Sequence, residues 1–138
     1  MLTKDIIDAL QNAEARALAT TGPHGINVVP FSVIDVSETE IHLFNFFMSK
    51  TVENLKENKT VALIAWSGLA GIQIKGEADY VESGEMFDSY TKEMKERFPE
   101  RTLHGIITIK PSYLYDVSAG SEAGRLLKSP ADFLASDV

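Results

Sequence analysis

The residues best suited to chemistry lie in one short segment, Phe46-Phe-Met-Ser-Lys-Thr51, between an apolar strand and a short helix. The first amides of a helix lack partners and carry the positive end of its dipole, so a phosphate can bind there. Lys50 would add a cation, and Ser49 or Thr51 a hydroxyl. A lysine is unfavourable at a helix start unless an anion compensates it. The same residues also fit an ordinary helix cap with a solvated lysine, because most caps bind nothing.

Other reactive patterns are missing from the sequence. His24, His42 and His104 form no H-x-x-x-H pair, which argues against a metal site. Ser32 and Ser49 lie in no G-x-S-x-G elbow, and no G-x-G-x-x-G follows a strand. We therefore expect no bound metal and no dedicated catalytic side chain.

The length of 138 residues is typical of one domain, and we expect residues 118–138 to form a C-terminal tail. The chain has 13 basic and 20 acidic residues, a net charge of −7, which disfavours nucleic acid and anionic membranes as partners. It has no cysteine, so disulfides and thiolate sites are excluded. It shows no signal peptide and no apolar run of the ~18 residues that a membrane span needs, so we expect a cytoplasmic protein.

The elements that position this segment follow from periodicity and turn residues. Helices are predicted near 3–13, 52–58 and 84–98, and strands at 16–20, 26–36, 41–46, 60–66, 72–81 and 103–117, the last as a pair or one long bent strand. Short turns between the strands favour antiparallel pairing. Pro30 cannot donate a ladder hydrogen bond, so its strand should lie at an edge, a bulge or a split. Gly76 suggests a bulge.

Three stretches of the chain, in this order, are typical of one family. A-L-A-T-T-G-P-H-G-I-N-V-V-P-F-S resembles the first hairpin of the pyridoxamine 5'-phosphate oxidase-like split barrels that bind flavin mononucleotide (FMN). F-M-S-K-T-V-E-N-L-K-E-N-K-T-V-A-L-I resembles their phosphate segment, and G-I-Q-I-K-G-E-A their next strand. The resemblance covers residues 14–81 and is closest to the small FMN-binding proteins. It implies a mainly β fold with short flanking helices, a six-stranded antiparallel split β-barrel with Greek-key topology, and a homodimer with flavin at its interface.

The resemblance also implies the site residues. Lys50 and Thr51, with Met48 and Ser49 beside them, would hold the FMN phosphate, and Asn54 would reach the ribityl chain or the phosphate. The remaining residues would surround the isoalloxazine ring. They are Val29, Pro30, Phe31 and Ser32 along the ring, Phe46 and Phe47 lining the pocket, and Trp66 and Gln73 from the next hairpin or the partner subunit.

The expected function is that of an FMN-dependent oxidoreductase or electron carrier, with a small-molecule substrate or a redox partner. Pyridoxamine-phosphate oxidases are longer and grip their substrate with arginines and a histidine that have no equivalent set here, so that reaction is not assigned. One alternative is a flavin-free binding or sensing module for haem or another small ligand. Another is a dimeric barrel whose apolar seam is only an interface.

Overall fold

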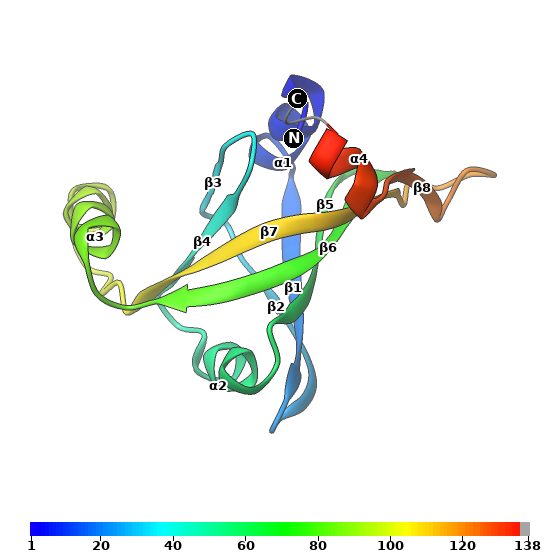
Figure 1. Cartoon of the computed structure of the whole chain (residues 1–138). Coiled ribbons are helices and arrows are strands. Elements are labelled where there is room, and N and C mark those ends of the chain that lie inside the picture. Colours follow the sequence, from blue (N-terminus) through cyan, green and yellow to red (C-terminus); the bar gives the residue numbers. More distant parts are fainter. Residues whose placement is uncertain (136–138) are drawn as a thin grey trace.

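The computed structural model describes residues 1–135 of the chain, with side chains through residue 133. It contains four helices and eight strands (Figure 1). In chain order they are α1 (Lys4–Gln11), β1 (Ala15–Gly22), β2 (Gly25–Pro30), β3 (Ile34–Val36), β4 (Ile41–Asn45), α2 (Ser49–Glu57), β5 (Thr60–Ser67), β6 (Ala70–Val81), α3 (Glu85–Arg97), β7 (Gly105–Asp116), β8 (Arg125–Lys128) and α4 (Pro130–Ala135).

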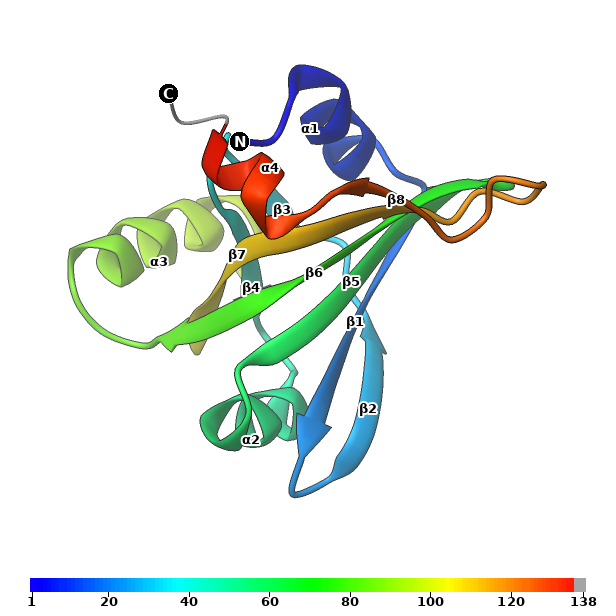
Figure 2. The ribbon, with the colours of Figure 1, turned by 45° about the vertical axis from the view of Figure 1, so that its right-hand side comes forward.

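All the strands belong to one antiparallel sheet in the order β2-β1-β5-β6-β7-β4-β3, with β8 added beside β7. The sheet curls strongly, and α2 lies at the end that carries the β1–β2 hairpin, while α1 and α4 lie at the other end (Figures 1 and 2). The predicted mainly β, antiparallel class is confirmed. The predicted number of six strands is wrong, because one expected strand divides in two and the tail adds β8.

The divided strand is the one that contains Pro30. The chain leaves β2 at Pro30, crosses residues 31–33 outside any strand, and re-enters the sheet as β3 at the opposite edge. Proline has no N–H for a second ladder, so a strand that ends there at an edge loses nothing. The predicted split at this proline is confirmed, and we call residues 31–33 the split segment.

A bulge bends β6 where it pairs with β7. The register shifts between Lys75 and Gly76, as the sequence predicted. A Cβ at Gly76 would lie 2.3 Å from the main-chain oxygen of Lys110, so only glycine fits this close approach of two backbones. Residues 105–116, by contrast, form one continuous strand through Pro111 rather than two.

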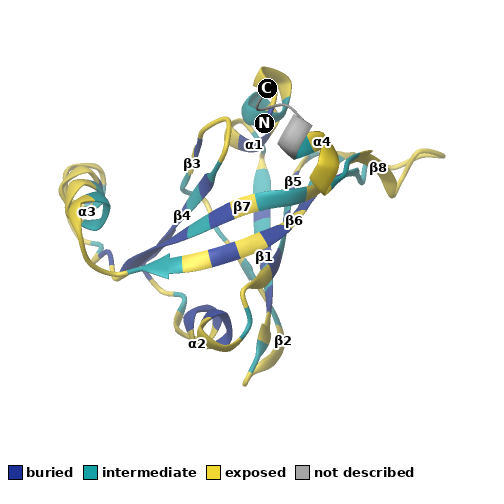
Figure 3. Cartoon of the chain, in the orientation of Figure 1, coloured by how far each residue is buried: buried dark blue, intermediate teal, exposed yellow. Residues whose placement is uncertain are grey.

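The core fills the inside of the curl, and buried and exposed residues alternate along the middle of β6 (Figure 3). The first three residues of β7 are all buried. The most deeply buried residues of the core include Leu10, Leu18, Ile41, Leu43, Leu63, Ile74, Ile107, Ile109 and Leu114. A second cluster joins α3 to β4 and to the strand start at β7 through Phe44, Phe46, Met94, Leu103 and Ile106. This second cluster packs α3 against the end of β4, next to the β4–α2 junction.

A polar contact also holds α3. The Tyr90 hydroxyl donates to Asp35 Oδ2 at 2.6 Å, lies 2.8 Å from His42 Nδ1, and its ring meets Phe44 edge-on at 4.9 Å between centroids. Burial, and next the hydrogen bond to Asp35, raise the pKa of Tyr90 above its ordinary value of 10.0. Folding therefore favours the protonated phenol.

We expect Tyr90→Phe to reduce the alkaline loss of stability. Because the pKa of Tyr90 is higher in the folded than in the unfolded protein, Tyr90 contributes to the free energy of unfolding. That contribution is complete below about pH 10 and is lost as the pH rises toward the pKa of the folded state. The wild-type free energy of unfolding should therefore fall above pH 10 more steeply than that of the variant, as urea titrations from pH 8 to 11.5 would measure. Tyr80, whose pKa is also raised by burial, stays in both proteins. Parallel pH profiles would contradict the assignment.

The predicted tail contains more structure than expected. Residues 118–138 include β8 and α4, although residues 136–138 lie outside the described part of the chain. The Lys128 ammonium donates to the Met1 carbonyl oxygen at 2.7 Å, which ties the tail to the N-terminus. None of the helices described is long and apolar enough to cross a bilayer.

Candidate functional site

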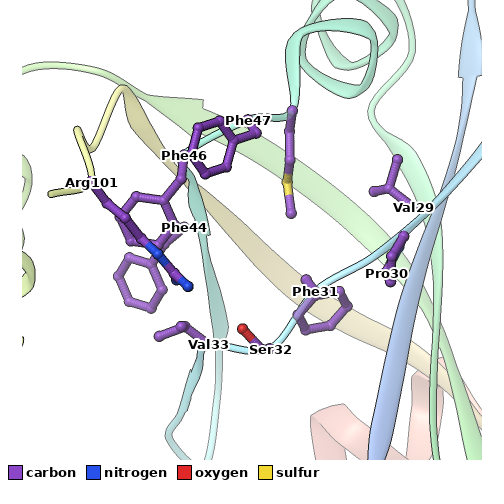
Figure 4. Close-up of a pocket in the computed structure, with 10 residues that line it drawn as sticks. Val29, Pro30, Phe31, Ser32, Val33, Phe44, Phe46, Phe47 and Arg101 are labelled. Carbon is purple, nitrogen blue, oxygen red and sulfur yellow. The ribbon is translucent and has the colours of Figure 1, made fainter. Parts of the chain in front are cut away.

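The split segment and the β4–α2 junction face one another across a cavity of about 330 Å³ (Figure 4). This volume is within the range of small-molecule sites. Seven residues predicted for the site line it, namely Val29, Pro30, Phe31, Ser32, Phe46, Phe47 and Met48. Val33, Phe44 and Arg101 complete the lining. Segments that lie about 15 residues apart in the chain are thus brought together by the split of the strand.

The start of α2 adjoins this cavity through Met48. The Met48 N–H donates to Asn45 Oδ1 at 2.7 Å, and intrahelical bonding begins with Val52 N–H to Met48 O at 3.0 Å. The amides of residues 49–51 therefore have no acceptor within the helix. Ser49 and Lys50 are exposed there. This helix start offers the exposed residues Ser49 and Lys50 to an anion, with two main-chain amides, a hydroxyl and a cation.

Asn45 fixes the geometry of this junction. Its buried side chain donates from Nδ2 to the Tyr80 hydroxyl oxygen at 2.9 Å while its Oδ1 caps Met48. Gly105 leaves room for the Tyr80 ring, because a Cβ there would lie 2.2 Å from Tyr80 Cζ. No periodicity in the sequence pointed to Asn45, which occupies the last position of an apolar strand.

Two predicted site residues of α2 face the protein instead of the cavity. Thr51 has no exposed surface, and its hydroxyl oxygen accepts from Asn27 Nδ2 at 3.3 Å. Asn54 also has none. Its amide donates to Thr20 Oγ1 at 3.2 Å and to the Gly25 carbonyl oxygen at 3.1 Å, and it accepts from the His24 N–H at 3.0 Å. The burial of Thr51 leaves neither its hydroxyl nor its main-chain N–H open to an anion, and the contact predicted for the Asn54 side chain finds no open surface.

We expect Asn54→Ala to destabilise the protein by at least about 2 kcal/mol, because it leaves buried hairpin groups without partners. Urea unfolding of the ligand-free protein would measure this loss. The matched control is Glu57→Ala, which removes an exposed side chain from the same helix and should change stability by less than about 0.5 kcal/mol. A neutral Asn54→Ala would contradict the structural role.

Trp66 and Gln73 do not join the cavity within one chain. They lie on β5 and β6, on the face of the sheet opposite the buried Leu63 and Ile74. We call this the outer face. Its members come from five strands and are mostly apolar. They include Ala17, Ala19, Val28, Pro30, Ala62, Ile64, Trp66, Gln73, Lys75 and Tyr115. Val28 is 62% exposed and Trp66 is 37% exposed.

Arg101 is the one lining residue of the cavity that carries a charge. Its guanidinium lies 4.4 Å from the centroid of the Phe98 ring and 5.3 Å from that of Phe46. In Figure 4 it lies with Phe44 on the wall across from Val29 and Pro30. Among the described residues no carboxylate forms a salt bridge with it. Sequence reasoning missed it, since only the packing of α3 brings it near residues about 55 positions earlier.

The cavity contains a cation, a hydroxyl and mostly apolar walls, and it offers no paired carboxylates or imidazole to a reaction. Within residues 1–135, His, Cys, Asp and Glu side chains form no group of three that could hold a metal ion. The arrangement suits the binding of a flat, largely apolar group with an anionic end.

Comparisons with known proteins agree with this geometry. The family model for pyridoxamine 5'-phosphate oxidase matches residues 2–118. An uncharacterised protein of Methanocaldococcus jannaschii is 30% identical over 131 residues, which cover 91% of this chain and 87% of that protein.

Solved structures share the fold at lower identity. HupZ of Group A Streptococcus has a TM-score of 0.76 at 18% identity and covers 90% of this chain and 100% of its own. An FMN-binding protein of Syntrophomonas wolfei has a TM-score of 0.69 at 22% identity, covering 83% of this chain and 85% of its own. HutZ, the haem storage protein of Vibrio cholerae, has a TM-score of 0.63 at 17% identity, with 84% and 95% covered. The curled sheet is thus a split barrel, and the chain belongs to the pyridoxamine 5'-phosphate oxidase-like FMN-binding split-barrel superfamily.

Proposed function

We propose that the protein is an FMN-binding flavoprotein, an oxidoreductase or electron carrier, whose flavin occupies the cavity between the split segment and the β4–α2 junction. One observation carries the proposal. An apolar cavity adjoins, through Met48, a helix start whose first amides and Lys50 are available to an anion. FMN combines the two matching parts, a flat ring system and a phosphate.

The residues present fit this cofactor. Phe31, Phe44 and Phe46 supply aromatic walls for the ring. β2 is an edge strand, so alternate main-chain groups near Val29 have no strand partner and can bond the polar edge of the ring. The main-chain amides and the side chains of Ser49 and Lys50 would hold the phosphate.

A bound flavin supplies hydride and single-electron transfer, and the protein orients it and tunes its electrostatics. Main-chain carbonyl groups along residues 29–32 and the Ser32 N–H would set the polarity around the ring, because Pro30 has no N–H and the Phe31 N–H donates to Arg16. Arg101 would place a positive charge near it and attract anionic groups. We assign no acid–base side chain, and we do not assign the pyridoxamine-phosphate oxidase reaction, because Arg101 alone is no substitute for a set of basic substrate ligands.

The outer face supports a homodimer. Many of its side chains are small or apolar, and large ones such as Val28 and Trp66 remain open to solvent in the single chain. Covering this face with a second copy would carry the partner's Trp66 and Gln73 toward the cavity wall formed by Val29 and Pro30. The two residues that the single chain leaves apart would then complete the site.

The function is tested by titrating the purified protein with FMN and following flavin fluorescence and absorbance. We expect saturation at one flavin per chain, with quenched or shifted spectra. A protein that is colourless as purified and takes up no added FMN would overturn the proposal.

A flavin-free haem module is the second candidate, and the likeness to the haem storage protein HutZ favours it. Haem iron is usually held by His, Cys, Met or Tyr. The ten lining residues include Met48 but no His, Cys or Tyr. The cavity therefore suits flavin better. Adding haemin with and without FMN separates the two, since a sharp Soret band that FMN does not displace would favour haem.

A further inference from the structure

Arg16 on β1 is a buried cation with no acidic partner. Its residue surface is 8% exposed, and among the described side chains no carboxylate forms a salt bridge with it. Its guanidinium donates to three carbonyl oxygens instead, Nε to Leu10 at 2.6 Å, Nη2 to Gln11 at 2.5 Å and Nη1 to Ser32 at 2.9 Å. Three fixed donors on one planar group make this an arrangement that lysine could not reproduce.

These bonds join two parts of the molecule that are not neighbours in sequence. Leu10 and Gln11 form the last turn of α1, where the carbonyl groups carry the negative end of the helix dipole. Ser32 belongs to the split segment, which lines the cavity. The main chain of Arg16 adds a fourth contact, because its carbonyl oxygen accepts the Phe31 N–H at 3.2 Å. Arg16 thus holds the split segment from both its backbone and its side chain.

Apart from Arg16, the split segment is held by the packing of Phe31 on the core and of Val33 on the second cluster. It lies between β2 and β3 at opposite edges of the sheet and belongs to neither strand. A stretch without ladder bonds would sample several backbone conformations unless side chains fixed it. Burying a guanidinium is costly, and burial lowers the pKa of Arg16. The free-energy cost of burying this guanidinium is explained if the function of the protein requires one orientation of the split segment.

We infer that Arg16 is a positioning residue for the cofactor site, whose guanidinium fixes the Ser32 carbonyl and the main chain of the split segment against the flavin. This inference rests on the proposed function for its ligand. It also makes a claim about the ligand-free protein, that the split segment is ordered through Arg16.

The test compares Arg16→Met and Arg16→Lys with Leu114→Ala, a buried core substitution on β7 at a residue that does not line the cavity. The readouts are FMN affinity, the visible spectrum of bound flavin, amide hydrogen exchange over residues 31–33 without ligand, and Tm. We expect Arg16→Met to speed exchange in the split segment, weaken FMN binding by at least about ten-fold and shift the spectrum. Arg16→Lys should give a smaller change in the same direction. Leu114→Ala should lower Tm and leave the other readouts unchanged.

A lower Tm for the Arg16 variants with wild-type exchange, affinity and spectrum would overturn the inference, since that is the result of a purely structural role. If Arg16→Met does not fold, Arg16→Lys decides by the same readouts. If the wild type binds no FMN, the proposed function fails. The exchange data then still decide whether Arg16 orders the split segment.

Discussion

Lys50→Ala should weaken FMN binding by about ten-fold or more. Loss of a hydrogen bond to a charged group costs about 1.5–3 kcal/mol, and each 1.4 kcal/mol is ten-fold in affinity. Lys50 is exposed at the first turn of α2, so its removal should leave the fold intact. Fluorescence titration of wild type and variant at low salt, where screening is weakest, would measure the difference.

Lys56→Ala is the matched control, because Lys56 is exposed in the last turn of the same helix and the substitution changes net charge equally. Its FMN affinity should stay within about two-fold of wild type, since Lys56 follows Lys50 by six residues, about 9 Å along the helix at 1.5 Å per residue, and cannot hydrogen-bond to a phosphate at the start of α2. Raising the salt concentration should reduce the difference in FMN affinity between Lys50→Ala and wild type. Equal affinity of both variants would show that the phosphate is held elsewhere.

Ile64→Glu should convert the proposed dimer to a monomer and abolish tight flavin binding. Ile64 lies on the outer face between Ala17 and Gln73. A carboxylate buried there without a partner costs several kcal/mol, so about 3 kcal/mol or more would raise the dimer dissociation constant roughly a hundred-fold. Light scattering coupled to size exclusion would measure the mass, and FMN titration the loss of affinity.

Ser83→Glu controls for the added charge, because Ser83 is exposed in the turn before α3 and away from the outer face. It should remain dimeric and bind FMN as the wild type does. A dimer that survives Ile64→Glu would place the interface elsewhere. A monomeric Ile64→Glu that still binds FMN normally would remove the partner's contribution to the site.

The features that could be predicted from the sequence are those with a local cause. Pro30 predicted an edge, a bulge or a split because it lacks an N–H, which is a property of that residue alone. Gly76 predicted the bulge because it lacks a Cβ. Seven of the ten residues that line the candidate cavity were also predicted, through the resemblance of the stretches that hold residues 29–32 and 46–48 to one family.

The features that could not be predicted depend on packing between distant segments. Arg101 lines the cavity because α3 packs on Phe44 and Phe46, which no spacing reveals. The amide of Asn54 could hydrogen-bond to a cofactor, but its donors and its acceptor are all used by groups of the β1–β2 hairpin. β8 is a short strand within a polar stretch, and it is a strand because it pairs with β7. A side chain's partner is a tertiary property, so its type alone could not separate a site residue from a structural one.

The central claim is that FMN lies with its ring in the cavity and its phosphate at the start of α2. A crystal structure of the protein grown with FMN tests this most directly. We expect the ring against residues 29–32 and the phosphate within hydrogen-bond distance of the amides of Ser49 and Lys50. A flavin found outside this cavity, or a phosphate remote from α2, would contradict it.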